Sequence, residues 1–246
     1  MLTLFKRFLT QEAKNKIKAN IPRIFSVKNS YSQCGEDLIV AFLLDSIYGP
    51  GTRTYLDLGA NHPFKLSNTA LFYHQGGRGV LVEPDPYLAK VLGRTRPRDL
   101  VIQKGVHVQG LDSADFFIME PPTLNTFSKA EMERYVKMGH PLRQTATVAL
   151  ENVNTILSTS ASFDFMTIDI EGLDAEVLRS VDWHVHRPTC VCVETLTYEK
   201  NNAPRKITEI NDYMISQGYL LYADTYINSI YVDLSKWNSR RCSFVD

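Results

Sequence analysis

The sequence predicts an α/β fold with a mostly parallel β-sheet. Short apolar runs rich in β-branched residues alternate with helical patterns along the chain, as they do in repeated β-α-β units. The runs 80–82 and 165–168 are continuously apolar or β-branched, which is typical of strands that helices cover on both faces. Close to the end of the chain, two strand-like runs separated by a short turn predict an antiparallel hairpin that closes one edge of the sheet.

Acidic residues and glycines mark where several of these elements begin and end. Glu36 and Asp37 precede the first expected helix, where acidic side chains favour the N-terminus. The first strand ends at Asp57 and a glycine turn, and Gly172 permits a turn after a later strand. Two cysteines in the strand 189–194 are two positions apart, so they share one buried face. The expected strands are 54–59, 79–83, 100–106, 163–170, 189–194, 219–223 and 229–234, and the expected helices are 38–46, 67–74, 87–93, 175–181 and 207–217.

The composition excludes several classes of protein. Of the 246 residues, 44% are hydrophobic and 22% are charged, so the chain is neither intrinsically disordered nor fibrous and forms one large domain or two small ones. The 27 basic and 27 acidic side chains cancel, which argues against a generic nucleic-acid binder. Four cysteines without a CxxC pair predict a reducing compartment and no zinc-ribbon site.

Residues 1–28 differ in charge from the rest of the chain and are predicted to form a basic amphipathic leader before a single domain at 29–246. The leader has seven basic residues and one acidic residue, a net charge of +6, which leaves −6 on the remainder. Its apolar residues recur at near-helical spacing, as in a helix that lies on an anionic membrane surface, docks on a partner or packs on the acidic domain. Because no run approaches the ~20 apolar residues of a membrane span and no signal-peptide core is present, we predict a cytoplasmic protein, with peripheral membrane contact through the leader as an open alternative.

The stretch 120–145 is the least regular part of the predicted domain. It places Pro121, Pro122, Gly139 and Pro141 around a helical segment at 129–138. A long insertion of this kind is either a loop over the substrate or a surface excursion, and the sequence supports both readings equally.

A cofactor site is predicted where the first two strands end. Ligands of open α/β sheets bind beyond the carboxyl ends of the strands, which places Asp57 and Gly59 at the mouth of the site. Glu83 ends the next strand 26 positions after Asp57, and its carboxylate can accept hydrogen bonds from ribose hydroxyls. The loop has Asn61 and Pro63 in place of a Gly-x-Gly-x-x-Gly pattern, which disfavours a pyrophosphate and therefore NAD and FAD. S-adenosylmethionine, a nucleoside without phosphates, fits better; an NAD-dependent oxidoreductase and a catalytically inactive binding scaffold are the alternatives.

Six segments in order along the chain carry a resemblance to a known family. They are 31–37 (Tyr-Ser-Gln-Cys-Gly-Glu-Asp), 56–63 with 67–69, 77–85, 123–128, 164–172 with 176–178, and 187–194. Over roughly residues 31–234 the chain thereby resembles the FkbM family of methyltransferases. The resemblance implies a class I methyltransferase fold, a Rossmann-like three-layer sandwich around a seven-stranded sheet whose last strand is antiparallel. It also implies methyl transfer from S-adenosylmethionine to oxygen, commonly a hydroxyl of a sugar in a glycan or of a similar small polyhydroxylated acceptor.

The same resemblance extends the predicted cofactor site. It adds Gln33 and Glu36, which by themselves read as residues before a helix. It also places Gln103, at the end of the third strand, near the adenine, although the segment Gln-Lys-Gly-Val departs from the Asn-x-Gly-Ile of the family. The expected cofactor-binding residues are therefore Gln33, Glu36, Asp57, Gly59, Asn61, Glu83 and Gln103.

The expected catalytic residues are carboxylates at the ends of later strands. Methyl transfer to a hydroxyl requires alignment of the reacting atoms and removal of a proton. Asp169 and Glu171 emerge from the strand expected beside the first, and two nearby carboxylates can raise the pKa of one of them towards neutrality. Glu194 and His62 could join Asp169 as bases or, in a second hypothesis, as ligands of a divalent metal ion. The sequence makes no prediction of the oligomeric state.

Overall fold

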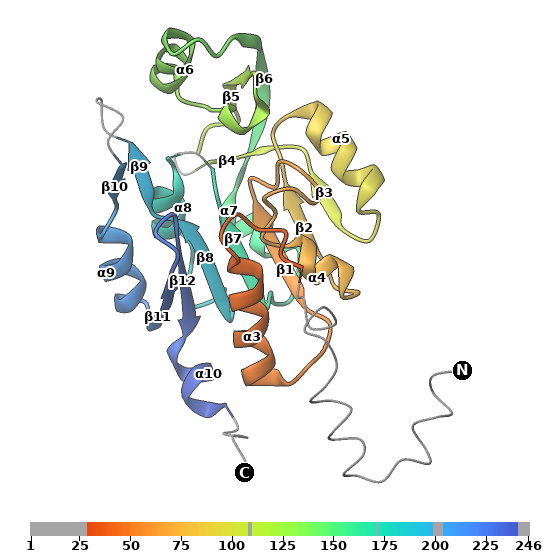
Figure 1. The fold of residues 1–246 in the computed structure, drawn as a ribbon, viewed down its shortest axis with the longest axis vertical. Helices are drawn as coiled ribbons and strands as arrows, with labels where there is room; N and C mark the ends of the chain where they lie inside the picture. The colour runs from red at the N-terminus through yellow and green to blue at the C-terminus, as the bar shows by residue number, and fades with distance from the viewer. Residues whose placement is uncertain (1–28, 108–109, 171, 199–203, 241–246) are drawn as a thin grey trace, which may run out of the picture.

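The computed structural model describes residues 29–107, 110–170, 172–198 and 204–240, and its centre is a seven-stranded β-sheet with helices on both faces (Figure 1). The strand order is β11-β12-β8-β7-β1-β2-β3, in which β12 is antiparallel to both of its neighbours and the other pairs are parallel. The predicted class I methyltransferase fold, with its antiparallel terminal hairpin, is confirmed. The strands are β1 (Thr54–Leu58), β2 (Arg78–Val82), β3 (Leu100–Ile102), β7 (Phe165–Ile168), β8 (Cys190–Glu194), β11 (Tyr219–Asp224) and β12 (Asn228–Asp233).

Two apolar cores cover the two faces of the sheet. Alternate strand residues point to opposite faces, so Leu56 belongs to one core and its neighbour Tyr55 to the other. The core around Leu56 includes residues of α7 (Val153–Leu157), α8 (Asp174–Ser180) and α9 (Glu209–Ser216). The core around Tyr55 includes residues of α3 (Glu36–Tyr48), α4 (Ala70–His74) and α5 (Pro86–Thr95). Cys190 and Cys192 are buried together in this second core, as their spacing predicts. A last helix, α10 (Leu234–Ser239), follows β12.

The expected strand 100–106 is wrong in extent, because the chain turns in its middle. The Lys104 N–H bonds to the Ile102 carbonyl across a tight turn at Gln103. After this turn, β4 (Gly105–His107) leaves the main sheet and pairs in parallel with β6 (Leu142–Asn152). A Cβ at Gly105 would lie 2.5 Å from the ring of Phe127 and 2.6 Å from the side chain of Leu150, so a larger residue there would require these two side chains to move.

The stretch expected to be irregular, 120–145, belongs instead to an ordered unit. It lies within a hairpin of β5 (Ser113–Met119) and β6 (Leu142–Asn152), which are antiparallel from Ser113 opposite Ala149 to Met119 opposite Leu142. The connection between the strands contains the 3₁₀ turn η2 (Pro122–Leu124) and α6 (Lys129–Lys137), and we call residues 113–152 the insert. Figure 1 shows β5, β6 and α6 together at one end of the molecule. A small core of Phe117, Met119 and Tyr135 holds the hairpin to α6.

The structure does not test three of the predictions. The leader 1–28 and Glu171 lie outside the described residues, and the boundaries of a single domain at 29–246 stay a prediction. Among the described residues, no helix combines the length and the apolar character that a membrane span requires.

Candidate functional site

Four carboxyl groups lie where parallel strands end at one edge of the sheet. Asp57 is the last residue but one of β1, Glu83 directly follows β2, Asp169 directly follows β7, and Glu194 is the last residue of β8. The strand registers place them along a common edge, because Asp57 lies opposite Thr167, and Leu58 lies opposite both Val82 and Ile168. This is the edge at which open α/β sheets bind ligands.

Gly59 allows the ends of β1 and β7 to approach closely. Its φ is +90°, and a Cβ at this position would lie 1.9 Å from the carbonyl oxygen of Asp169. The Asp169 N–H in turn bonds to the Leu58 carbonyl at 3.0 Å. Any other residue at 59 would have to push Asp169 away, so this glycine fixes the distance between the first loop and the end of β7.

Glu83 is buried and held by two backbone N–H groups. Its Oε2 accepts a hydrogen bond from the Asn61 N–H at 2.7 Å, and its Oε1 accepts one from the Asp85 N–H at 2.8 Å. Burial raises the pKa of Glu83 to about 7, because it and the charges of Asp85 and Asp57 outweigh the two hydrogen bonds, which lower it. Each oxygen keeps a second lone pair, so the carboxylate can accept two further hydrogen bonds.

Asp57 is part of a buried polar network beneath the loop 59–69. Its carboxylate accepts a hydrogen bond from the Thr69 hydroxyl at 2.6 Å, and burial raises its pKa. The Thr69 hydroxyl also accepts hydrogen bonds from both terminal nitrogens of Arg96, at 3.1 Å each. Arg96 is fully buried and forms an ion pair of 2.7 Å with the equally buried Asp99. Asp99 also accepts a hydrogen bond from the Tyr55 hydroxyl, so the network connects β1, the loop and the end of α5.

Asp169 and Glu194 form a hydrogen-bonded pair of carboxyl groups, which requires one proton between them. Asp169 is an exposed residue, but many protein atoms lie near its carboxyl group and reduce its hydration. This burial is the main cause that raises the pKa of Asp169 to about 7; the charges of Asp174 and Asp57 add to it, and the hydrogen bond from Glu194 opposes it. The pair can therefore hold or accept a proton near neutral pH.

Two further polar residues shape the site and were missed in the sequence. Asp174 is buried, and its carboxylate accepts hydrogen bonds from the N–H groups of Ile170 and Gly172, so it defines the turn after β7. An acidic residue at the start of a helix was the available signal. Asn68 donates a hydrogen bond to the Thr167 hydroxyl at 2.9 Å, on the strand that leads to Asp169. Its segment contributes to the family resemblance, but the residue type alone predicts no role.

The structure places Glu36 at the same edge and leaves Gln33 on the surface. Glu36 is buried, and its oxygens accept hydrogen bonds from Cys34 N–H, Thr225 and Asn228. Burial opposes ionisation, but these hydrogen bonds outweigh it and lower the pKa of Glu36. Asn228 lies opposite Glu194 in the strand register, so Glu36 lies beyond Glu194 along the same edge. Its carboxylate oxygens already hold hydrogen bonds within the protein.

His62 and Gln103 are both exposed. The His62 Nδ1 accepts hydrogen bonds from the N–H groups of Phe64 and Lys65, so the ring shapes its own loop. Within the described part of the chain, no three His, Cys, Asp or Glu side chains gather as a metal site would require. The structure thus brings Asp169 and Glu194 together, but not His62 with them. Gln103 occupies the turn between β3 and β4.

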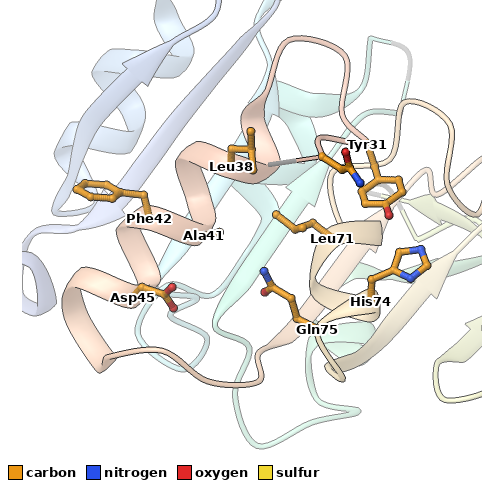
Figure 2. A pocket seen from close by; sticks show the side chains of 9 residues that line it. Tyr31, Leu38, Ala41, Phe42, Asp45, Leu71, His74 and Gln75 are labelled. Atoms are coloured by element: carbon orange, nitrogen blue, oxygen red, sulfur yellow. The ribbon is translucent and has the colours of Figure 1, made fainter. Parts of the chain in front are cut away.

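A groove of about 370 Å³ lies between α3 and α4, away from these carboxyl groups. Figure 2 shows Leu38, Ala41 and Phe42 of α3 on one side and Leu71 and His74 of α4 on the other. None of the four carboxyl groups at the strand ends lines this groove. The chemistry of the site therefore has to be sought at the edge of the sheet.

Comparison with known proteins finds one family and several solved structures. The Methyltransferase FkbM domain family matches residues 57–221, about two thirds of the chain. No curated protein matches. The methyltransferase FkbM from Methylobacillus flagellatus KT is 14% identical over 74% of this chain and 43% of its own, with a TM-score of 0.43, so this chain spans less than half of that protein. A putative caffeoyl-CoA O-methyltransferase from Staphylococcus aureus is 9% identical over 94% of this chain and 96% of its own (TM-score 0.47). An O-methyltransferase from Bacillus cereus in complex with SAH is 12% identical over 89% and 87% (TM-score 0.37).

Proposed function

The chain belongs to the FkbM methyltransferase family, and we propose that it transfers a methyl group from S-adenosylmethionine to a hydroxyl of a sugar, a glycan or a similar small polyhydroxylated acceptor. The observation that carries the proposal is that the carboxyl groups at the strand ends lie in two different environments. Glu83 is buried and can accept two further hydrogen bonds, whereas Asp169 is hydrogen-bonded to Glu194 at the neighbouring strand end. The environment of Glu83 suits binding of ribose hydroxyls, and that of Asp169 and Glu194 suits a general base, which accepts a proton from the acceptor hydroxyl.

The residues of the first two strand ends fit the cofactor. Glu83 accepts hydrogen bonds from the two ribose hydroxyls with the lone pairs that Asn61 and Asp85 leave free. The loop at Gly59 and Asn61 receives the methionine end, next to the buried Asp57, because neighbouring carboxyl groups favour a cationic ligand. When bound, S-adenosylmethionine supplies an electrophilic methyl group and a neutral sulfide as leaving group.

The pair of Asp169 and Glu194 serves the acceptor. A hydroxyl is a weak nucleophile, and its proton has to leave as its oxygen bonds to the methyl carbon. The ionised member of the pair accepts this proton, and a pKa of about 7 matches the task at neutral pH. A sugar or other polyhydroxylated acceptor is proposed because the six sequence segments resemble a family that modifies such molecules.

Calorimetric titration with S-adenosylmethionine and with its demethylated product, S-adenosylhomocysteine, tests the cofactor. The wild type is expected to bind both, and Glu83→Gln to bind them about 10- to 100-fold more weakly, since it loses the charge that strengthens the ribose hydrogen bonds. Glu209→Gln is the matched control, because Glu209 is an exposed carboxylate on α9 and should leave the affinity unchanged.

Three results would contradict the proposal in different ways. Unchanged affinity in Glu83→Gln would remove the ribose assignment. Binding of NAD without binding of S-adenosylmethionine would favour an oxidoreductase. Binding of S-adenosylmethionine without methylation of any acceptor in a panel of sugars and glycans would favour an inactive scaffold.

A further inference from the structure

The turn 122–125 of the insert is bonded to the two residues that hold Glu83. The Asn61 side chain donates a hydrogen bond to the Pro122 carbonyl at 3.3 Å. The Asn125 side chain donates one to Oδ2 of Asp85 at 3.2 Å. Asn61 and Asp85 are also the residues whose backbone N–H groups bond to the two oxygens of Glu83. The same turn therefore fixes Glu83 from both sides.

The turn itself is firmly held by the insert. Asn125 is buried, and its Oδ1 accepts a hydrogen bond from the Met119 N–H at 2.8 Å. Thr126 and Phe117 exchange two backbone hydrogen bonds of 2.9 and 3.1 Å. Because Phe117 and Met119 belong to the core that packs on α6, the position of Asn125 is set by the insert as a whole.

Asp85 connects Asn125 to Glu83. Its Oδ1 accepts hydrogen bonds from the N–H groups of Tyr87 and Leu88, which caps α5, while its Oδ2 faces Asn125. The carboxylate is thus held between the helix and the insert, and its own N–H points at Glu83. Without Asn125, the helix cap alone would hold this carboxylate among the described hydrogen bonds.

We propose that Asn125 is a positioning residue of the cofactor site, which acts through Asp85 on Glu83 and so connects cofactor binding to the insert. The inference rests on the proposed function, because it takes Glu83 as the ribose-binding group. It gives the insert a role beyond that of a surface excursion: its own fold maintains the cofactor carboxylate. It also assigns a task to Asn125, which has no contact with Glu83 of its own among the described hydrogen bonds.

The experiment measures the affinity of the full chain for S-adenosylhomocysteine by calorimetry over a range of pH. Asn125→Ala is expected to bind about 3- to 30-fold more weakly, which is less than the full effect of one hydrogen bond to a charged group, because Asn125 acts on Glu83 only through Asp85. It should also move the pH at which affinity is half lost to a higher value. The reason is that the Asp85 N–H bond lowers the pKa of Glu83, whereas burial and the charges of Asp85 and Asp57 raise it. A purely structural role would weaken folding without moving this midpoint.

A charge exchange distinguishes the proposed contact from general damage. Asn125→Asp places a carboxylate against Asp85, and Asp85→Asn places two amide N–H groups against each other, so each single variant should bind more weakly. The double variant Asp85→Asn with Asn125→Asp restores a donor and an acceptor, and both retain an oxygen for the helix cap and for Met119 N–H. Its affinity should return to within about threefold of the wild type. Glu131→Gln, which removes an ion pair of the insert on α6, is the control and should bind like the wild type.

The outcomes are separable. If Asn125→Ala folds and binds with wild-type affinity at every pH, the inference is wrong while the proposed function stands. If the double variant regains stability to urea but not affinity, the contact is structural only, and the inference is again wrong. If the wild type itself does not bind S-adenosylhomocysteine, the proposed function fails and this inference fails with it.

Discussion

At the residue scale, Asp169 and Glu194 differ from Glu83 and Asp174 in their hydrogen-bond partners. Glu83 and Asp174 accept hydrogen bonds from backbone N–H groups, which cannot give up a proton to a reaction. Asp169 is instead paired with another carboxyl group and reaches solvent. This environment suits a group that exchanges a proton during turnover, since a partner and an exit route for the proton are both present.

The pair predicts a rise of kcat with pH. A base must be ionised to accept the hydroxyl proton, so kcat of the wild type should increase as the pH rises through about 7 and then level off. Asp169→Asn should lower kcat by about 10²- to 10⁴-fold while the affinity for S-adenosylhomocysteine changes far less. Steady-state kinetics on both sides of neutral pH provide the measurement.

Glu194→Gln serves as the matched variant for this prediction. The amide still donates a hydrogen bond to Asp169 but removes the second titrating group, so the rise of kcat should move to lower pH. A flat pH profile of the wild type, or an Asp169→Asn variant that keeps its activity, would exclude the pair as the base.

At the element scale, a buried ion pair at the end of α5 supports the loop that follows β1. Arg96 bonds to Asp99 and Thr69 and packs over the rings of Tyr55 and Tyr73, with centroid distances of 5.4 and 5.1 Å. Thr69 then bonds to Asp57. The end of one helix thereby determines the position of a carboxylate on the neighbouring strand.

Breaking this pair is expected to destabilise the fold strongly. Arg96→Met leaves the Asp99 charge buried without its cation, which should lower the free energy of unfolding by about 3–5 kcal/mol in urea denaturation. Adding Asp99→Asn should recover part of this loss, because it removes the uncompensated charge. Arg179→Met is the control: its ion pair with Glu209 spans 3.5 Å between exposed side chains, so the loss should stay below about 1 kcal/mol. Equal losses for Arg96→Met and the control would show that the buried pair does not hold the loop.

The main strands of the fold could be predicted from the sequence, whereas the buried ion pair of Arg96 and the strand β6 could not. The strands of the main sheet were predictable because their apolar runs follow from burial on both faces. Arg96 lies in the segment Arg-Thr-Arg-Pro-Arg-Asp, whose composition is typical of a surface, and only the tertiary contacts bury it. In β6, polar residues such as Arg143 and Gln144 are exposed, and the strand is defined by its pairing with β5 rather than by an apolar run. Positions of acidic residues at strand ends were predictable, whereas the Asp169–Glu194 contact and the role of Asp174 depend on how strands and turns meet.

At the scale of the whole molecule, the carboxyl groups divide into two sets whose contributions to stability change with pH in opposite directions. Glu36 and Asp233 have lowered pKa values because hydrogen bonds, and for Asp233 also Arg187, outweigh burial. Their contribution to stability is present above their unfolded pKa and is lost as the pH falls through the lower folded value. Glu83 and Asp169 have pKa values raised to about 7, mainly by burial. Their contribution is fully present below the unfolded pKa and is lost as the pH rises through about 7.

These two sets predict that the chain without cofactor is most stable in mildly acidic solution. Between the unfolded pKa of a glutamate and the folded value of about 7, the native state binds more protons than the unfolded state, so the free energy of unfolding falls as the pH rises. For Glu83, which is 4% exposed, the expected loss between mildly acidic and mildly alkaline pH is about 1–3 kcal/mol. Urea denaturation across this range measures it, with Glu83→Gln as the comparison. Glutamine does not titrate, so the difference between wild type and variant isolates Glu83 from all other groups. A difference that stays constant with pH would mean that Glu83 is ionised in the folded protein throughout, as it would be if burial did not control its protonation.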